Sequence, residues 1–131
     1  MNQKESRLLI IDDDNRNIFA LTAVLRSKGY EVLTAQSAQE GIDLLKKNPG
    51  IKAVLLDMMM PEMDGYEALA VLKGDEELAT VPVFAVTAQA MVGDRERCLE
   101  AGADEYIAKP IDVDLLLHLL KAHKATGSNE R

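Results

Sequence analysis

Five short apolar runs occur along the chain, and each is followed by a segment with helical periodicity. The third run, Ala53 to Leu56, holds four apolar residues with no polar residue between them. Such a run is typical of a strand buried on both faces, as in a parallel sheet covered by helices. We therefore expect strands at residues 7–11, 31–35, 53–56, 83–86 and 105–108.

Apolar residues spaced by three or four positions predict a helix after every strand. Two Ser/Asp-x-x-Glu patterns resemble capping boxes, which mark helix starts, and glycines close several of the periodic segments. Asp112 is placed to cap the last helix. The expected helices run from Asn15 to Gly29, from Ser37 (with Glu40) through Leu45, from Asp64 (with Glu67) to Gly74, over about 92–101, and from Asp112 to a polar tail at 125–131.

The alternation of strands and helices predicts the fold class. Strand–helix units in series form a parallel sheet with helices on both faces, wound in the right-handed sense. An eight-fold barrel is excluded, because 131 residues supply only five units. We expect one α/β domain over residues 1–124, a flavodoxin-like three-layer sandwich with strand order 2-1-3-4-5 and five helices.

Polar residues follow four of the five predicted strands at the point where each strand ends. Asp12 and Asp13 follow the first strand, Asp57 the third, Thr87 the fourth and Lys109 the fifth. The carboxyl ends of parallel strands lie at one edge of the sheet, where ligands bind in open α/β folds. We therefore expect these five side chains to gather in one crevice.

The residue types in this crevice indicate phosphoryl chemistry. Three ionised carboxylates repel one another unless a cation lies among them. Oxygen ligands without His or Cys favour a hard ion, and a shell completed by water suits Mg²⁺. Thr87 and Lys109 could then bind phosphoryl oxygens, while Asp57 acts as the nucleophile that forms an acyl phosphate.

Charge and composition exclude several classes of partner. The net charge of −7 argues against direct nucleic-acid binding, which needs clustered Lys and Arg. No apolar run approaches membrane-spanning length, so no membrane partner is expected. The single cysteine, Cys98, cannot form an internal disulfide, which fits a cytoplasmic protein.

With these motifs in place, the chain resembles the receiver domains of response regulators, the phosphoacceptor half of two-component signalling. The resemblance extends from Leu8 to Leu120, and its details are similar to receivers attached to hybrid histidine kinases. The residues that carry it are Asp12-Asp13, Asn17, Asp57, Met60-Pro61-x-Met63-Asp64-Gly65, Thr87-Ala88-Gln89-Ala90-Met91, Gly93-Asp94-Arg95, Gly102-Ala103-Asp104 and Lys109-Pro110.

The resemblance implies an acceptor and a magnesium site. Asp57 would accept a phosphoryl group from phosphohistidine on a histidine kinase or a histidine phosphotransfer protein, and would slowly lose it again. Asp13, Asp57 and the Met59 backbone carbonyl would ligate Mg²⁺, and Asp12 would hold a coordinated water.

The resemblance also implies a switch. Thr87 and Lys109 would bind the phosphoryl oxygens, and a cis bond between Lys109 and Pro110 would aim the lysine. Thr87 would move toward the phosphoryl group and Tyr106 would turn inward behind it. The protein would then act as a signalling switch rather than as an enzyme with a substrate.

The last helix carries two leucines outside its expected core face. If its other apolar residues face the sheet, Leu115 and Leu119 point away from it, one turn apart. We expect the face formed by helix 92–101, strand 105–108 and the last helix to bind a downstream partner or a second copy. His118 and His123 are expected to be surface histidines remote from the crevice.

Two other functions remain open at this point. A magnesium-dependent phosphohydrolase of the haloacid-dehalogenase type would use the same nucleophile, but it places a second acid two positions later, where this chain has Met59. A docking module without phosphorylation would usually lack the acceptor, the acidic pair or the lysine, and all of these are present. The phosphoacceptor switch is the function that the sequence favours.

Overall fold

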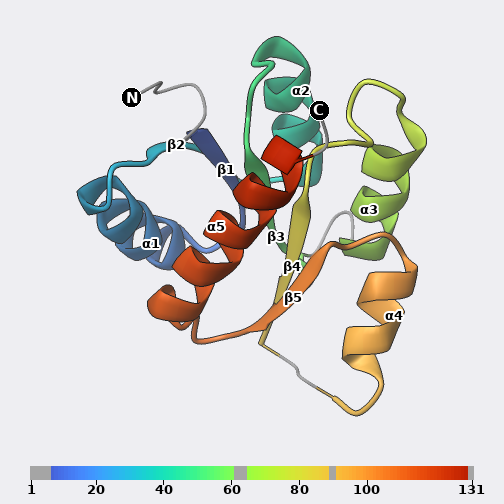
Figure 1. The fold of residues 1–131 in the computed structure, drawn as a ribbon. Coiled ribbons are helices and arrows are strands. Elements are labelled where there is room, and N and C mark those ends of the chain that lie inside the picture. Colours follow the sequence, from blue (N-terminus) through green and yellow to red (C-terminus); the bar gives the residue numbers. More distant parts are fainter. Residues whose placement is uncertain (1–6, 61–64, 89–90, 130–131) are drawn as a thin grey trace.

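The computed structural model describes residues 7–60, 65–88 and 91–129. Their core is a five-stranded parallel sheet in the order β2-β1-β3-β4-β5, which confirms the predicted order (Figure 1). The strands are β1 (Arg7–Ile11), β2 (Glu31–Ala35), β3 (Ala53–Asp57), β4 (Val83–Thr87) and β5 (Glu105–Ala108).

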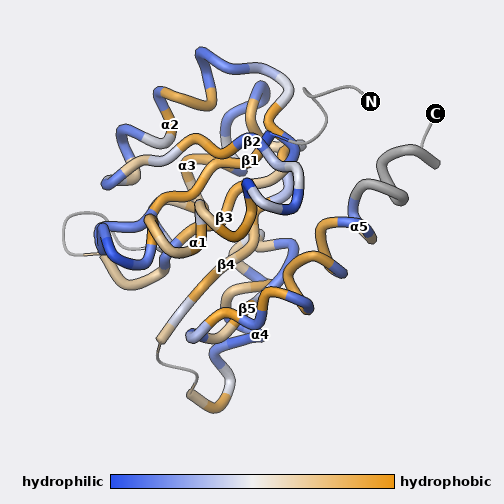
Figure 2. The backbone as a smooth tube through the Cα atoms, turned by 90° about the vertical axis from the view of Figure 1, so that its left-hand side faces the viewer, coloured by the Kyte–Doolittle hydropathy of each residue, from blue (hydrophilic) through white to orange (hydrophobic). Residues whose placement is uncertain are grey.

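Within the described residues, five helices cover the two faces of the sheet and complete the flavodoxin-like sandwich. One apolar cluster holds buried residues of α2, α3 and α4, and the other holds buried residues of α1 and α5. Figure 2 shows the apolar residues concentrated on the strands. The helices are α1 (Asn15–Ser27), α2 (Ala38–Lys47), α3 (Gly65–Gly74), α4 (Asp94–Glu100) and α5 (Val113–Asn129).

The apolar runs form strands because both faces of the sheet are covered. Every residue of β3 and of β4 is buried. Neighbours in a strand alternate between the two faces, so that Leu9 and Ile11 pack on one cluster while Leu8 and Ile10 pack on the other. Continuous apolar runs rather than alternating ones are therefore required here.

Among the residues that the structure describes, side chains cap the starts of three helices, and two of these caps, Ser37 and Asp112, were predicted. The Asp14 carboxylate accepts hydrogen bonds from the N–H groups of Arg16 and Asn17 at the start of α1. Ser37 accepts from the Glu40 N–H at 3.2 Å. The Glu40 carboxylate, however, accepts from the N–H of the residue before Ser37 rather than from Ser37 itself. The Asp112 side chain caps α5 by accepting from the N–H of Leu115.

Two helices differ in length from the prediction. The fourth begins only at Asp94, because Gly93 just before it has a left-handed backbone with φ of +85°. Helix α5 continues to Asn129 instead of ending near Ala125, although the residues that follow Ala125 are weak helix formers. The capping pattern at Asp64 and the motif residues Pro61, Met63, Gln89 and Ala90 lie outside the described residues.

Two expectations about α5 were wrong. Leu119 is only partly exposed and packs against the α1/α5 cluster, so that Leu115 alone of the pair is exposed. His123 is half-buried: its Nε2 lies 3.0 Å from Glu105 Oε2 and its ring contacts Phe84. His118 is exposed, as expected. Among the described residues, no helix is both long and apolar enough to cross a membrane.

Candidate functional site

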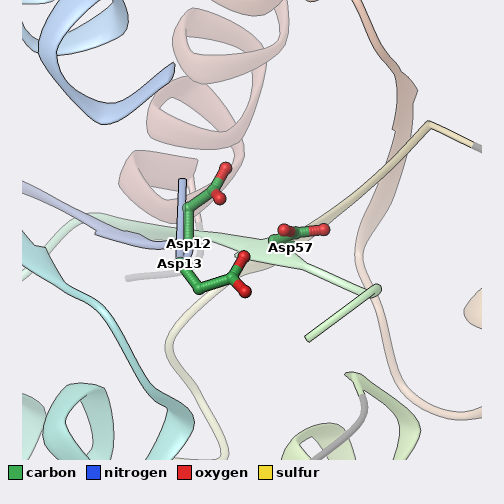
Figure 3. A group of neighbouring side chains, drawn as sticks. All are labelled: Asp12, Asp13 and Asp57. Atoms are coloured by element: carbon green, nitrogen blue, oxygen red, sulfur yellow. The ribbon is translucent and has the colours of Figure 1, made fainter. Parts of the chain in front are cut away.

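Three carboxylates gather where β1 and β3 end (Figure 3). These strands are neighbours in the sheet, with Ile11 opposite Leu56, so the residues that follow them lie side by side. One carboxylate oxygen from each of Asp12, Asp13 and Asp57 lies within 4.8 Å of the others. The predicted acidic cluster therefore forms.

The members of the cluster differ in burial and in their partners. Asp12 and Asp57 are only 3% and 5% exposed, whereas Asp13 is open to solvent. The Asp57 Oδ1 atom accepts a hydrogen bond from the Met59 N–H at 3.0 Å. Asp12 accepts from the Asp14 N–H at 2.9 Å and from the Asn17 side-chain amide at 2.7 Å. Hydrogen bonds thus hold the two buried carboxylates in place, while the Asp13 carboxylate is exposed to solvent.

Lys109 brings the one positive charge that the described residues place among these acids. Its Nζ lies 3.3 Å from Asp12 Oδ2 and 3.6 Å from Asp57 Oδ2. Its backbone N–H donates to the Thr87 carbonyl at 2.8 Å, which continues the pairing of β4 with β5. The bond from Lys109 to Pro110 is cis, as the resemblance implied.

This environment shifts the pKa values of both Asp57 and Lys109. Burial raises the pKa of Asp57, and the Asp12 carboxylate adds to this, although the Met59 N–H and the Lys109 ammonium oppose it. Burial alone would lower the pKa of Lys109, but the charges of Asp57 and Asp12 outweigh it and raise that pKa. Lys109 therefore stays charged at neutral pH and partly offsets the acids.

The cluster fits a magnesium ion on the chemistry of its donors. All three donors are carboxylate oxygens, the ligand type that hard divalent cations prefer. The exposed Asp13 leaves one side of the cluster open, so that water could complete the coordination shell. The predicted contribution of the Met59 carbonyl stays a prediction.

The two predicted switch residues, Thr87 and Tyr106, lie on the neighbouring strands β4 and β5. Thr87 is buried at the end of β4 and lines a cavity of about 250 Å³. The Tyr106 hydroxyl donates to Asp94 Oδ2 at 2.9 Å, at the start of α4. The other residues lining the cavity are Met58, Met59, Tyr66, Met91, Val92, Asp94 and Arg97.

Sequence reasoning missed the roles of Asn17, Tyr66 and Asp94. Asn17 was quoted only as a detail of the resemblance, yet it positions Asp12. Tyr66 and Asp94 contact each other although they lie 28 residues apart. No short-range pattern reports such a contact, because it depends on how α3 and α4 pack.

A larger cavity, of about 580 Å³, lies at the opposite edge of the sheet. It is lined by the segments that lead into β3 and β4, including Ile51 and Pro82. Its charged lining residues are Lys46 and Glu77, and Lys46 pairs with Asp75 at 3.4 Å. Lys46 and Glu77 do not belong to the acidic cluster, which lies where the strands end.

Comparison with known families matches residues 8–121 to the response regulator receiver domain. The polar-differentiation response regulator DivK of Brucella ovis is 37% identical over 117 residues, which cover 88% of this chain and 94% of DivK. The match therefore spans nearly the whole of both chains.

Solved structures agree with the sequence comparison. A putative response regulator from Chloroflexus aurantiacus superposes with a TM-score of 0.84 at 34% identity, covering 92% of this chain and 98% of that one. The receiver domain of the sensor histidine kinase PA1611 from Pseudomonas aeruginosa gives 0.80 at 33% identity, covering 89% and 95%. The PA1611 structure has a magnesium ion coordinated in its active-site cleft.

Proposed function

This chain belongs to the response regulator receiver family, and from this we propose that it is a phosphoryl-accepting switch with Asp57 as the acceptor. The observation that carries the proposal is the geometry at the strand ends. A buried carboxylate with a raised pKa lies within 4.8 Å of two further acids and 3.6 Å from a lysine. A carboxylate whose pKa is shifted by burial and by specific charged neighbours is a candidate for a functional site.

In the proposed reaction an Asp57 oxygen attacks phosphorus. The bond from phosphorus to the donor nitrogen of a phosphohistidine breaks, and its electron pair stays on the imidazole, which takes up a proton. The product is an acyl phosphate on Asp57. Lys109 and Thr87 would hold the phosphoryl oxygens. A magnesium ion held by Asp13, Asp57 and the Met59 carbonyl, with Asp12 holding a coordinated water, would offset the negative charge of the transferred group.

Magnesium is proposed from the donor set and from its presence in the related PA1611 receiver domain. The phosphodonor would be a histidine kinase or a histidine phosphotransfer protein, and the phosphoryl group would be lost again by slow hydrolysis. The signal would leave through the face formed by α4, β5 and α5, toward a partner or a second copy. On that face Leu115 is 43% exposed.

Intact mass after incubation with acetyl phosphate tests this function. With Mg²⁺ present, we expect the mass to rise by one phosphoryl group, and peptide mapping should place it on Asp57. Chelation of the metal should prevent the gain. Turnover of the donor without any adduct would favour the hydrolase, and an inert protein that still binds Mg²⁺ would favour a docking module.

Lys109→Met should slow the phosphorylation of Asp57 by about 100-fold or more, measured as the initial rate of mass gain at saturating Mg²⁺. The Lys109 ammonium lies 3.6 Å from the attacking carboxylate, and loss of one such stabilising group typically costs about 10²–10³ in rate. Lys47→Met is the control, because Lys47 is exposed and lies outside the site. A rate within about twofold of the parent would contradict a role for Lys109.

A further inference from the structure

Helix α4 is held to the rest of the domain by few contacts. Only one of its residues, Cys98, is buried, whereas α1 has two buried residues and α2 and α3 have four each. Its N-cap, Gly93, provides no side-chain hydrogen bond. A helix with so little buried apolar surface needs other contacts to stay in one position.

Those contacts converge on one carboxylate in the first turn of α4. Asp94 Oδ1 accepts from the Tyr66 hydroxyl at 3.1 Å, and Asp94 Oδ2 accepts from the Tyr106 hydroxyl at 2.9 Å. Tyr66 belongs to α3 and Tyr106 to β5. The single Asp94 side chain therefore ties α4 to two neighbouring elements.

Further contacts reinforce the Tyr66 side of this cluster. The Tyr66 hydroxyl lies 3.6 Å from the Cys98 sulfur, and the Arg97 guanidinium lies 5.0 Å from the centre of the Tyr66 ring. Burial and the Asp94 carboxylate raise the pKa of Tyr106 to about 12, and burial raises that of Tyr66. Both hydroxyls thus remain protonated donors at neutral pH.

Two residues of this cluster, Tyr66 and Asp94, line the cavity of about 250 Å³. The same cavity is lined by Met58, Met59 and Thr87, and Met58 follows Asp57 directly in the chain. Phosphorylation of Asp57 would replace the single carboxylate charge by a phosphoryl charge of about −1.5 to −2 close to this cavity. The cavity gives the surrounding residues room to rearrange in response.

We propose that the hydrogen bonds of Tyr66 and Tyr106 to Asp94 act as a latch, which keeps α4 in the position observed here and opposes its rearrangement when Asp57 is phosphorylated. Asp94 is then a positioning residue that sets how easily the site is switched. The proposal rests on the proposed function of Asp57, and it adds the restraint that the phosphoryl group must overcome.

The first test measures binding of beryllofluoride, a stable mimic of a phosphoryl group, in excess Mg²⁺. Asp94→Asn should bind it about tenfold more tightly than the parent, since one charge-assisted hydrogen bond is lost only from the unmodified state. Tyr106→Phe, which removes a single hydroxyl, should also tighten binding. The double variant should gain little over Asp94→Asn, because both changes break the same contact.

Glu96→Gln is the matched control. Glu96 is exposed in the same first turn of α4, so its replacement makes the same change in charge near the helix terminus. It should leave the affinity for beryllofluoride unchanged. Equal affinities of Asp94→Asn and the parent, weaker binding by Asp94→Asn, or an equal effect of Glu96→Gln would overturn the latch.

A second measurement tests the latch without any phosphoryl mimic. Amide hydrogen exchange in α4 should be about tenfold faster in Asp94→Asn than in the parent or in Glu96→Gln, with exchange in β1 and β3 unchanged. Unchanged exchange in α4 would overturn the latch, even in a protein that accepts phosphate. If the parent binds no beryllofluoride while Asp94→Asn still exchanges faster in α4, the proposed function is overturned and the latch is not.

Discussion

Asp57→Asn is expected to take up no phosphoryl group from acetyl phosphate, under conditions in which the parent protein is converted to the adduct. The asparagine amide has almost the same shape and can still accept the Met59 N–H, but it is not a nucleophile toward phosphorus. Intact mass spectrometry at saturating Mg²⁺ measures the loss. Asp114→Asn, at an exposed acid of α5, should behave as the parent does.

The same variant should be more stable than the parent in metal-free buffer at neutral pH. The pKa of Asp57 is raised in the folded state, so the native fold favours the protonated acid, and stability falls as the pH rises through that raised pKa. The asparagine amide does not ionise, so the variant does not lose stability as the pH rises through this range. Urea unfolding at pH 7 and at a pH below the carboxylate range should show the difference at the higher pH alone.

Two results would contradict these expectations. Uptake of phosphate by Asp57→Asn at the parent rate would place the acceptor elsewhere. Equal stability of the two proteins at pH 7 would mean that Lys109 and the Met59 N–H fully compensate the buried charge, and that the site stores no electrostatic strain when metal is absent.

The sequence predicted the sheet well because the strand signal is local. Runs such as Ala53 to Leu56 are apolar throughout, and this is compatible only with a position covered on both faces. The convergence of Asp12, Asp57 and Lys109 followed from topology alone, since parallel strands end at one edge. Fold and site could be predicted together for this reason.

The contacts that sequence could not supply depend on packing between elements. The periodicity of α5 placed Leu119 on the outer face. In the structure Leu119 lies at the boundary of the apolar face and packs against the α1/α5 cluster. His123 carries no local signal for its contacts with Glu105 and Phe84, which lie on neighbouring strands. Asp94 likewise becomes informative only when α3, α4 and β5 are placed together.

The second large effect is on stability, and it concerns Phe84. This side chain of β4 is fully buried within the cluster formed with α1 and α5. Phe84→Ala should lower the free energy of unfolding by about 3–5 kcal/mol, because it removes a large apolar group and leaves a cavity. Urea denaturation followed by circular dichroism measures the loss as a shift in midpoint, with an unchanged dependence on urea concentration.

Phe19→Ala is the natural control, since Phe19 is the only other phenylalanine of the chain and is 78% exposed on α1. Its replacement should change stability by no more than about 0.5 kcal/mol. Phe84 lies near the start of β4, whereas Thr87 and the acidic cluster lie where the strands end. Folded Phe84→Ala should therefore still accept a phosphoryl group. A loss of stability below about 1 kcal/mol would show that the cluster closes around the missing ring.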